Sequence, residues 1–292
     1  MRRAEKETIM KIAISADSAI DLTEELKKKY DIKTVPFTVT MGDRTVKDGD
    51  VTIEELFAFV DKNKTLPKTS AINEAEFGEH FDGLLKEYDA VVHFSLSSGL
   101  TSACGNAKSA AKARKNVFVV DSLSLSAGIA LLAIYGRELA ESGATPEDIC
   151  EKCLARVPFV HASCELERVD YLYKGGRCSV LAFLGANILK IHPQILCKDG
   201  KMIAGKKYRG LYTRVTEKYV ADVLEEYDNP DLSRAFVAYT AADEKIVSEV
   251  VQTLKNRGFR EVFVTRTGAT VSSYLGEHTV GVAFINDGGS KR

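Results

Sequence analysis

The segment Ser-Leu-Ser-Ser-Gly-Leu-Thr-Ser-Ala-Cys-Gly-Asn, residues 95–106, stands where a strand should end and a helix begin. The preceding residues 90–94 are apolar and predict a buried parallel strand, and the alanine-rich residues 102–115 predict a helix. The first N–H groups of a helix lack intrahelical partners and the helix dipole favours negative charge, so this turn suits a phosphate or a carboxylate. An ordinary serine-rich loop with a Ser or Thr N-cap is the alternative.

Strands and helices alternate through the first half of the chain. Apolar strands are predicted at residues 10–15, 33–41, 90–94 and 116–120, with helices at 23–30, 73–88, 102–115 and 123–141. Three pairs have capping-box spacing: Asp21 with Glu24, Thr52 with Glu55, and Asn73 with Glu76. Such alternation favours a parallel sheet with helices on both faces.

Hydroxyl and acidic side chains gather where the predicted strands end. They are Asp17-Ser18, Thr69-Ser70 in a predicted polar loop, residues 95–98, and Asp121-Ser122. Ligands of open parallel sheets bind beyond the carboxyl ends of the strands. We therefore expect these side chains to meet around one ligand.

The pattern changes after about residue 157. Strands are predicted at residues 160–166, 191–197, 201–205, 235–240, 261–266 and 280–285, and helices at 169–173, 180–189, 213–227 and 244–257. Asp199-Gly200 is the strongest hairpin signal. The chain thus predicts an α/β protein of two domains: residues 11–160, a parallel α/β domain, and residues 161–287, an α/β domain with a mixed sheet. The ligand is expected in the cleft between them.

Composition excludes several classes of protein. The 292 residues include 40 basic and 41 acidic side chains, with a net charge of −1, so there is no global electrostatic attraction to nucleic acid. No apolar run approaches the ~20 residues of a membrane span, and no secretory signal is recognised, so we expect no stable membrane insertion and a cytoplasmic location. Reduced cysteines are expected there.

No catalytic or metal-binding pattern is found. The chain has no G-x-S-x-G elbow, no Walker A sequence, no G-x-G-x-x-G before a helix and no paired metal-ligating histidines. Cys150 and Cys153 form a C-x-x-C inside a predicted helix, where buried structural thiols are favoured over a redox or zinc site. His93 and His161 lie in predicted strands and are expected to be structural. We expect no cofactor, no metal and no catalytic centre.

Two basic segments leave alternatives open. Residues 206–210, Lys-Lys-Tyr-Arg-Gly, form either a solvated hairpin end or a surface that docks an acidic or phosphate-bearing partner. Lys174-Gly175-Gly176-Arg177 is either a helix stop or a loop over the cleft.

Taken together, several segments resemble the DegV family of bacterial fatty acid-binding proteins, in the family's order from about residue 11 to 286. They are Asp17-Ser18, Pro67-Lys68-Thr69-Ser70, residues 97–102, Asp121-Ser122, residues 172–177, residues 191–196 with Asp199-Gly200, residues 207–210 and residues 268–273. The resemblance implies two α/β domains with a long-chain fatty acid, bound as a ligand and not as a cofactor, buried between them.

The resemblance also implies roles for individual residues. Thr69, Ser70, Ser97 and Ser98 would bind the carboxylate, as hydroxyls and helix N-terminal N–H groups do. Members of the FakB type present the fatty acid to a separate, dihydroxyacetone kinase-like fatty acid kinase. Arg209 matches the arginine that the family places toward the acyl head group and the kinase. The protein would then be a carrier and not an enzyme.

Two departures from the family pattern concern the head group. Ala71-Ile72 follows Thr69-Ser70 where the family commonly has Gln-Pro, and Tyr274 stands where it has a histidine. His278 is displaced by four positions from that place. Tyr274 and His278 are therefore the candidate replacements as head-group or partner contacts.

Two other hypotheses remain. In one, the chain is an enzyme acting on a small carboxylated or phosphorylated metabolite, with Asp17, Asp121 and Arg177 facing one another in the cleft. In the other, it binds a different lipid or a regulatory ligand and serves no kinase. Acyl-chain preference, the kinase partner and the oligomeric state are not set by these patterns.

Overall fold

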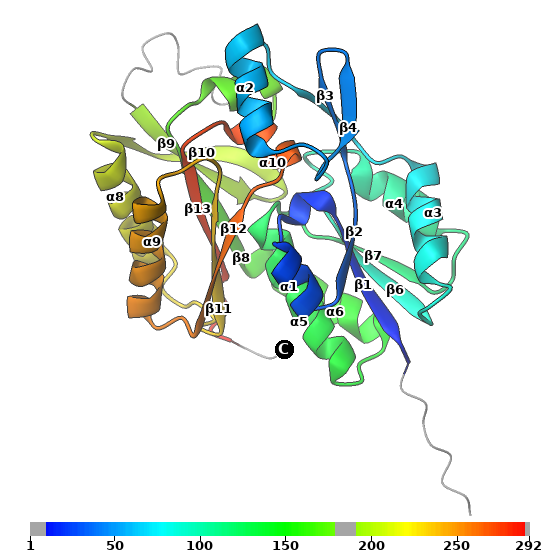
Figure 1. Ribbon diagram of the computed structural model, residues 1–292. Coiled ribbons are helices and arrows are strands. Elements are labelled where there is room, and N and C mark those ends of the chain that lie inside the picture. The colour runs from blue at the N-terminus through cyan, green and yellow to red at the C-terminus, as the bar shows by residue number, and fades with distance from the viewer. Residues whose placement is uncertain (1–9, 179–190, 290–292) are drawn as a thin grey trace, which may run out of the picture.

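The computed structural model of the chain describes residues 10–178 and 191–289. Within these ranges the strands form a four-stranded, a six-stranded and a three-stranded sheet. The two larger sheets lie side by side with helices between and around them, and the small sheet extends above the four-stranded one (Figure 1).

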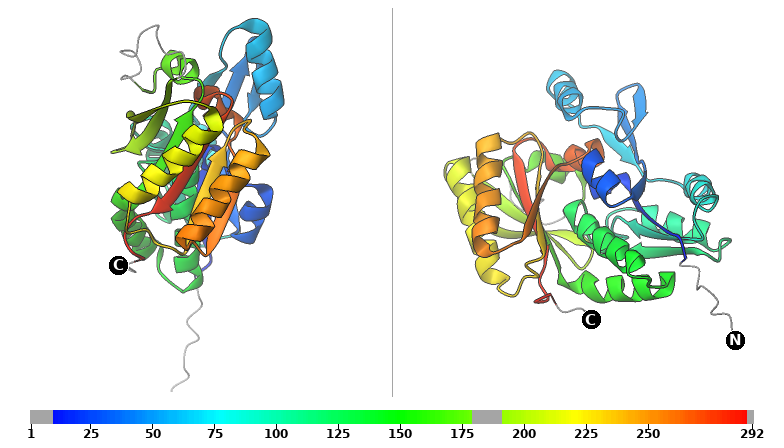
Figure 2. Two further views of the ribbon diagram at one scale, coloured as in Figure 1. Left: turned by 90° about the vertical axis from the view of Figure 1, so that its left-hand side faces the viewer. Right: turned by 60° about the horizontal axis from the view of Figure 1, so that its bottom comes forward.

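The four-stranded sheet is parallel throughout, in the order β2-β1-β6-β7. Its strands are β1 (Ile12–Asp17), β2 (Ile32–Val35), β6 (Ala90–Ser95) and β7 (Val117–Asp121). All residues of β1 and β6 are buried, as expected for central strands covered on both faces. The covering helices are α5 (Ala127–Glu141) and α6 (Pro146–Arg156) on one face, and α3 (Glu74–Leu84) and α4 (Ala103–Ala111) on the other (Figure 2).

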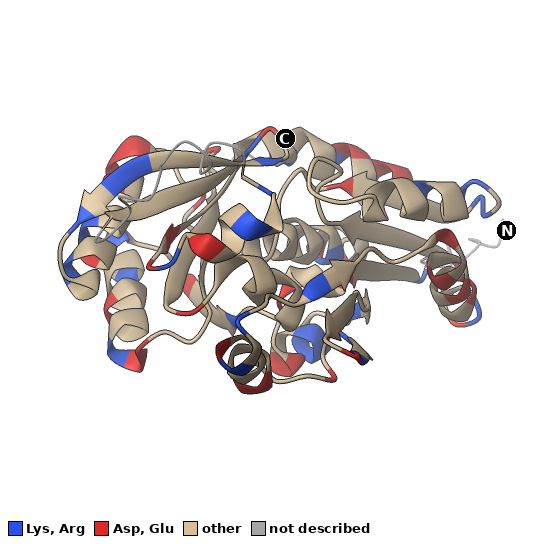
Figure 3. Ribbon diagram, turned by 90° about the horizontal axis from the view of Figure 1, so that it is seen from above, with Lys and Arg blue, Asp and Glu red and all other residues tan. Residues whose placement is uncertain are grey.

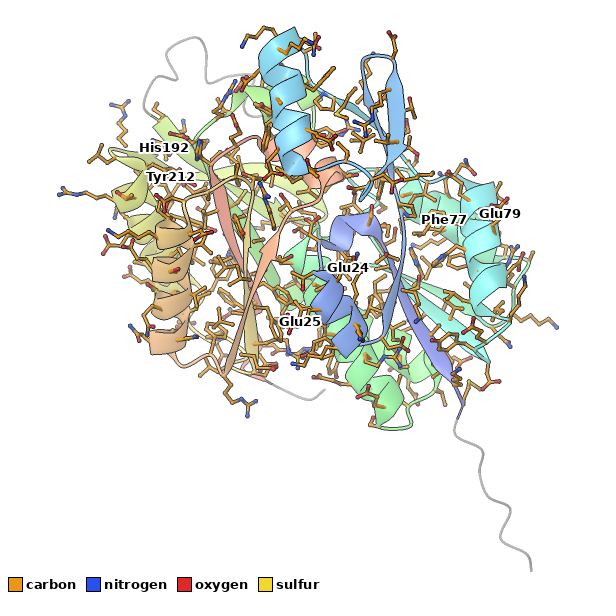
Figure 4. All side chains as sticks on the ribbon, viewed as in Figure 1. Glu24, Glu25, Phe77, Glu79, His192 and Tyr212 are labelled. Atoms are coloured by element: carbon orange, nitrogen blue, oxygen red, sulfur yellow. The ribbon has the colours of Figure 1, made fainter. Side chains whose placement is uncertain are left out.

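Helix α3 turns its apolar side to this sheet. Phe77 is fully buried on that side, whereas Glu79 is exposed (Figure 4). The rings of Phe77 and Phe81 lie 5.2 and 5.4 Å from that of His93 on β6. Ser15 Oγ is 3.0 Å from His93 Nδ1 and 2.7 Å from His80 Nε2. His93 is thus a packed core residue in this position, as its sequence context predicted.

The three-stranded sheet is antiparallel, in the order β4-β3-β5. Its strands are β3 (Thr38–Met41), β4 (Arg44–Lys47) and β5 (Lys68–Ser70). Helix α2 (Ile53–Asn63) packs on it through Leu56, Phe57 and Val60, which join Val39 and Met41 in one apolar cluster. The capping box predicted from Thr52 and Glu55 is present, and so is that of Asn73 and Glu76 at α3.

Two predictions about this half are wrong in detail. Residues 33–41 do not form one strand: the chain leaves the parallel sheet at Pro36-Phe37, and β3 enters the small sheet. Proline has no N–H to donate to a strand ladder, so it separates the two pairings. The polar loop predicted at residues 67–70 contains β5, which pairs with β3.

The helix starts also differ from the prediction at two places. Asp21 with Glu24 is not a capping box, because Thr23 is the N-cap of α1 (Glu24–Lys29) and its side chain accepts from the N–H of Leu26. The carboxylate of Asp21 instead accepts from Gly268 N. The helix expected from residue 123 begins only at Ala127, because Leu123 and Ser126 have positive φ angles of 45° and 50°.

The six-stranded sheet is mixed, in the order β10-β9-β8-β13-β11-β12, with β11 and β12 parallel and the other pairs antiparallel. Its strands are β8 (Val160–Leu166), β9 (Ile191–Lys198), β10 (Lys201–Arg209), β11 (Arg234–Tyr239), β12 (Glu261–Arg266) and β13 (Thr279–Ile285). Helices α8 (Tyr212–Glu226) and α9 (Glu244–Arg257) cover its outer face, and α5 contacts its inner face. Helix α5 therefore lies between the two large sheets (Figure 2).

The predicted hairpin is confirmed. Asp199 and Gly200 have φ angles of +49° and +75° and join β9 to β10, the pair of left-handed residues that a tight two-residue turn requires. The helix predicted at residues 180–189 lies outside the described residues.

Four short elements complete the fold: η1 (Ser18–Ile20), η2 (Val157–Phe159), α7 (Asp170–Gly175) and α10 (Ala269–Leu275). Helix α10, which was not predicted, contacts α7, α2, β3 and β5. It thereby joins the six-stranded half of the chain to the small sheet.

In the ribbon seen from above, basic and acidic positions are interspersed along the chain (Figure 3). Among the described residues, no helix is both long and apolar enough to cross a membrane.

Candidate ligand-binding site

The ends of three parallel strands meet around the turn that follows β6. The carboxylate of Asp17, at the end of β1, accepts from Ser95 Oγ at 3.1 Å and from Leu96 N at 2.8 Å. Ser122 Oγ, after β7, donates to the carbonyl of Ser95 at 2.7 Å. Asp121 accepts from Ser98 N at 3.2 Å. The convergence expected from the sequence is confirmed for these three strand ends.

Asp17 fixes the position of this turn from inside the protein. It is fully buried, and its hydrogen bonds to Ser95 Oγ and Leu96 N both reach the turn. Burial raises the pKa of Asp17 to about 7, partly offset by the hydrogen bonds from Leu96 and Ser95. Because β1 ends at Asp17, the path of β6 beyond Ser95 depends on a neighbouring strand and not on local sequence alone.

The hairpin tip closes over the same turn. Ser97 is fully buried, and its Oγ donates to the carbonyl of Gly200 at 2.7 Å and accepts from Gly99 N at 3.1 Å. A Cβ at Gly99 would lie 2.4 Å from the Gly200 carbonyl oxygen, so only glycine allows this approach. Ser97 therefore holds the tip of the β9–β10 hairpin, while Ser98 is exposed.

A cavity of about 240 Å³ opens beside this turn. Its polar wall residues include Thr69 on β5 and Tyr274 on α10, whose side-chain oxygens lie 2.7 Å apart, and also Thr101 and Ser102. Arg177 lines the same cavity, with its guanidinium carbon 4.7 Å from the centroid of the Tyr274 ring. The rest of its wall is largely apolar and includes Phe37, Leu96, Leu100, Leu125, Met202 and Leu275. We call it the outer cavity.

A smaller cavity, of about 50 Å³, lies between the start of α5 and the six-stranded sheet. We call it the inner cavity. Small side chains line it, among them Ala127, Ala162, Cys164, Ala238 and Ala283. Leu125, Met202 and Leu275 line both cavities, so the two adjoin at these three side chains.

The loop after α7 positions Arg177 and Tyr274. Gly176 ends α7 with a left-handed φ of +70°, and a Cβ at Gly175 would lie 2.4 Å from the Tyr274 ring. Arg177 Nη1 donates to the carbonyl of Gly175 at 2.7 Å. Both alternatives left open for Lys174-Gly175-Gly176-Arg177 therefore apply: it stops a helix and it places a side chain in the cavity wall.

The remaining predicted site residues lie elsewhere. Ser70 is exposed on β5, Arg209 is exposed at the end of β10, and His278 is exposed with its Nε2 4.0 Å from Glu167. None of these three is among the described residues that line the two cavities. Near the start of β9, His192 lies beside Tyr212, and its Nδ1 is 2.9 Å from Glu165 Oε1 (Figure 4).

Sequence reasoning missed the apolar walls. Phe37, Leu125, Met202 and Leu275 look like ordinary core residues, because apolar periodicity shows that a side chain is buried but not whether it faces a neighbour or a cavity. The sequence signal nearest to a wall residue was the family-like stretch at residues 268–273, which includes Val271 and directly precedes Tyr274.

The C-x-x-C pair lies within α6, as predicted. Cys153 is fully buried and Cys150 partly buried, and burial raises the pKa of both thiols above the ordinary range. Such thiols are weak nucleophiles. Among the described residues, no group of three His, Cys, Asp or Glu side chains is arranged to hold a metal ion.

A comparison with protein families gives a match along nearly the whole chain. The model described as "Uncharacterised protein, DegV family" matches residues 11–287. The chain belongs to the DegV family. The resemblance drawn from the sequence motifs is thereby confirmed.

Individual DegV relatives give the same assignment. A DegV domain-containing protein of Caldanaerobacter subterraneus is 34% identical over 206 residues, which cover 68% of this chain and 72% of the relative. A protein of Thermotoga maritima named "Fatty acid-binding protein" is 33% identical over 208 residues, covering 69% and 72%. A solved structure from Thermotoga maritima, whose description reports a fatty acid binding function, superposes with a TM-score of 0.80 at 30% identity over 95% of this chain and 99% of that one.

Proposed function

We propose that this DegV protein binds a long-chain fatty acid, with the carboxylate beside Thr69 and Tyr274 and the acyl chain in the outer and inner cavities. The observation that carries the proposal is that this polar pair and Arg177 line the outer cavity and not the apolar inner cavity that adjoins it. The relative named as a fatty acid-binding protein supports it.

The geometry suits a carboxylate at the outer end. The hydroxyls of Thr69 and Tyr274 can both donate to it once the hydrogen bond between them is broken, and Arg177 supplies a positive charge. Hydrogen bonds to a charged group are about twice as strong as those between neutral groups. Each buried methylene adds about 0.8 kcal/mol, so the apolar walls favour a long chain over a small polar metabolite.

The other residues inferred from the family keep proposed roles. Ser70, Ser97 and Ser98 are proposed as further carboxylate contacts, and for Ser97 this requires its Oγ to leave the Gly200 carbonyl. His278 and Arg209 are exposed and are proposed as contacts of a partner protein. We keep residues 11–160 and 161–287 as the proposed domains. Walls of both cavities come from both ranges, which supports a ligand between them.

We further propose that the protein is a carrier without a catalytic centre, in the cytoplasm, and that it presents the carboxylate to a separate fatty acid kinase. The alternative enzyme needed Asp17, Asp121 and Arg177 to face one another. Asp17 and Asp121 instead hold the turn after β6, and Arg177 lies over the Tyr274 ring. This geometry favours the carrier over the enzyme.

Solvent extraction and mass spectrometry of the purified protein, followed by titration of the delipidated protein with palmitate, test the ligand class. We expect about one fatty acid per chain and saturable binding. The proposal fails if the extract is empty and palmitate does not bind.

The kinase step needs its own test. Arg209→Ala should leave palmitate binding unchanged and reduce acyl phosphate formation by an added fatty acid kinase. Lys245→Ala, an exposed cation on α9, is the matched control. Equal transfer by all three proteins would remove Arg209 from the proposed partner surface.

A further inference from the structure

The segment Asp17-Ser18-Ala19-Ile20-Asp21, which begins at the last residue of β1, contacts two parts of the outer cavity wall. Asp17 binds the N–H of Leu96, which lines that cavity. In the other direction, Asp21 Oδ1 accepts from Gly268 N at 2.7 Å. Gly268 is the N-cap residue of α10, whose residues Val271, Tyr274 and Leu275 form the opposite wall.

Asp48 makes a parallel connection to the same helix. Its Oδ1 accepts from Ala269 N at 2.9 Å, and its Oδ2 accepts from Ser18 Oγ at 2.8 Å. Ser18 Oγ in turn accepts from the N–H of Phe37, a further wall residue, at 3.1 Å. Two carboxylates from the first half of the chain therefore hold two successive N–H groups at the start of α10.

Helix α10 depends on such outside contacts. It has seven residues, and its N-cap position is a glycine with no side chain to cap it. A helix this short is not stable in isolation, and its first N–H groups need acceptors. The two bonded pairs, Asp21 with Gly268 and Asp48 with Ala269, are separated by 247 and 221 positions in the chain. The orientation of Tyr274 thus depends on residues far away in the sequence.

The fit at this junction is close. A Cβ at Gly268 would lie 3.1 Å from Asp48 Oδ1 and 3.2 Å from Asp21 Oδ1. Asp21 is only 6% exposed, although burying a carboxylate is unfavourable. Burial raises the pKa of Asp21 to about 8, and the charge of Asp48 adds to the shift. The buried Asp21 side chain therefore supplies the acceptor that the N–H of Gly268 needs.

We propose that Asp21 and Asp48 are positioning residues of the head-group end of the cavity: they fix α10 so that the Tyr274 hydroxyl meets Thr69 and the ligand carboxylate. The inference rests on the proposed fatty acid binding. It assigns a role to residues 17–21. None of them lines either cavity, but Asp17 and Asp21 bind the backbone N–H groups of Leu96 and Gly268 beside the outer cavity.

The test is a double-mutant cycle between Asp48→Ala and Tyr274→Phe, with palmitate and hexadecanol as ligands. Hexadecanol has the same chain without the carboxylate. Each single variant should lower palmitate affinity about tenfold, as loss of a hydrogen bond to a charged group does, and the double variant should lose no more than Tyr274→Phe alone. Hexadecanol affinity should fall clearly less than palmitate affinity in both variants, because hexadecanol lacks the carboxylate that Tyr274 is proposed to bind, although α10 also supplies the wall residues Val271 and Leu275.

Two variants separate positioning from general stability. Asp48→Asn keeps an oxygen acceptor for Ala269 N and should restore wild-type palmitate affinity. Asp243→Ala removes the carboxylate that caps α9 through Lys245 N, at 2.8 Å, on a helix away from the cavities. It should lower thermal stability without changing the ratio of palmitate to hexadecanol affinity. Ser18→Ala, which removes one contact to Asp48, replaces Asp48→Ala in the cycle if the latter does not fold.

The inference is overturned if the losses from Asp48→Ala and Tyr274→Phe multiply to about a hundredfold, or if Asp48→Ala weakens hexadecanol as much as palmitate. These results leave the proposed function intact, because the wild type still binds palmitate. If the wild type binds neither ligand, the proposed function fails, and the inference fails with it.

Discussion

Thr69 Oγ1 and Tyr274 Oη lie 2.7 Å apart, although 205 positions separate the two residues. The contact joins β5 of the small sheet to α10 of the other half of the chain. In the proposed complex both hydroxyls turn to the ligand carboxylate. This contact is therefore the place to test the head-group assignment.

Thr69→Val removes the hydroxyl and keeps the shape of the side chain. We expect palmitate affinity to fall at least about tenfold, because a hydrogen bond to a charged group contributes about 1.5–3 kcal/mol. Calorimetric titration measures it, with Thr253→Val on α9 as the control. Unchanged affinity in Thr69→Val would mean that the carboxylate binds elsewhere.

Ala162→Leu should shorten the fatty acid that the protein prefers. Ala162 lines the inner cavity, and a leucine there would occupy the space proposed for the end of the acyl chain. Stearate affinity should fall relative to laurate, by about fourfold for each methylene that is displaced from the cavity. Competition with a series of saturated acids measures this, with the exposed Ala155→Leu on α6 as control. A parallel loss for all chain lengths would contradict the assignment.

The Ser15–His80–His93 cluster should make stability sensitive to acid. Burial lowers the pKa of His80 to about 4, and burial with the nearby His80 lowers that of His93 well below its usual value. The unfolded chain takes up these protons near pH 6.5, so each histidine's contribution is complete above that pH and is lost as pH falls toward its folded pKa. The loss is about 1.4 kcal/mol per pH unit for each group.

The contribution of His80 can be read from urea unfolding of His80→Gln and the wild type between pH 7 and pH 4.5. Asp17 and Asp21, whose raised pKa values add stability as pH falls, contribute oppositely in both proteins and cancel in the difference. The wild type should lose stability more steeply than the variant. If the free energies of unfolding of the two proteins change with pH in parallel, the pKa of His80 is not lowered in the folded state.

Arg156 should be a strong stabilising contact between the two halves. Its guanidinium donates to Asp231 at 2.7 Å and to Asp287 at 2.8 Å, and it is buried. Arg156→Met should lower the free energy of unfolding by about 3–5 kcal/mol, because two carboxylates are left without their partner. Urea unfolding measures it. The half-exposed pair of Arg168 and Asp170 is the comparison, and Arg168→Met should cost under about 1 kcal/mol.

Several parts of the fold could be predicted because their signals are local. The capping boxes at Thr52 and Asn73 and the turn at Asp199-Gly200 depend on side chains and φ angles within a few residues. The apolar run of residues 90–94 was enough for a central strand, since parallel strands are buried on both faces. The meeting of the strand ends followed from sheet geometry alone.

The sequence by itself therefore determined most of the strands and helices and the resemblance to the DegV family, and it predicted a ligand at the carboxyl ends of the parallel strands. Tertiary structure alone decided that Ser97 bonds to Gly200, that Asp21 and Asp48 cap α10 instead of Asp21 capping α1, and that Tyr274 meets Thr69. Periodicity and capping act over a few residues, whereas these contacts arise when elements far apart in the chain pack together. The cavities could not be predicted either, because the spacing of apolar residues in the sequence is the same whether a side chain packs against a neighbour or lines a cavity.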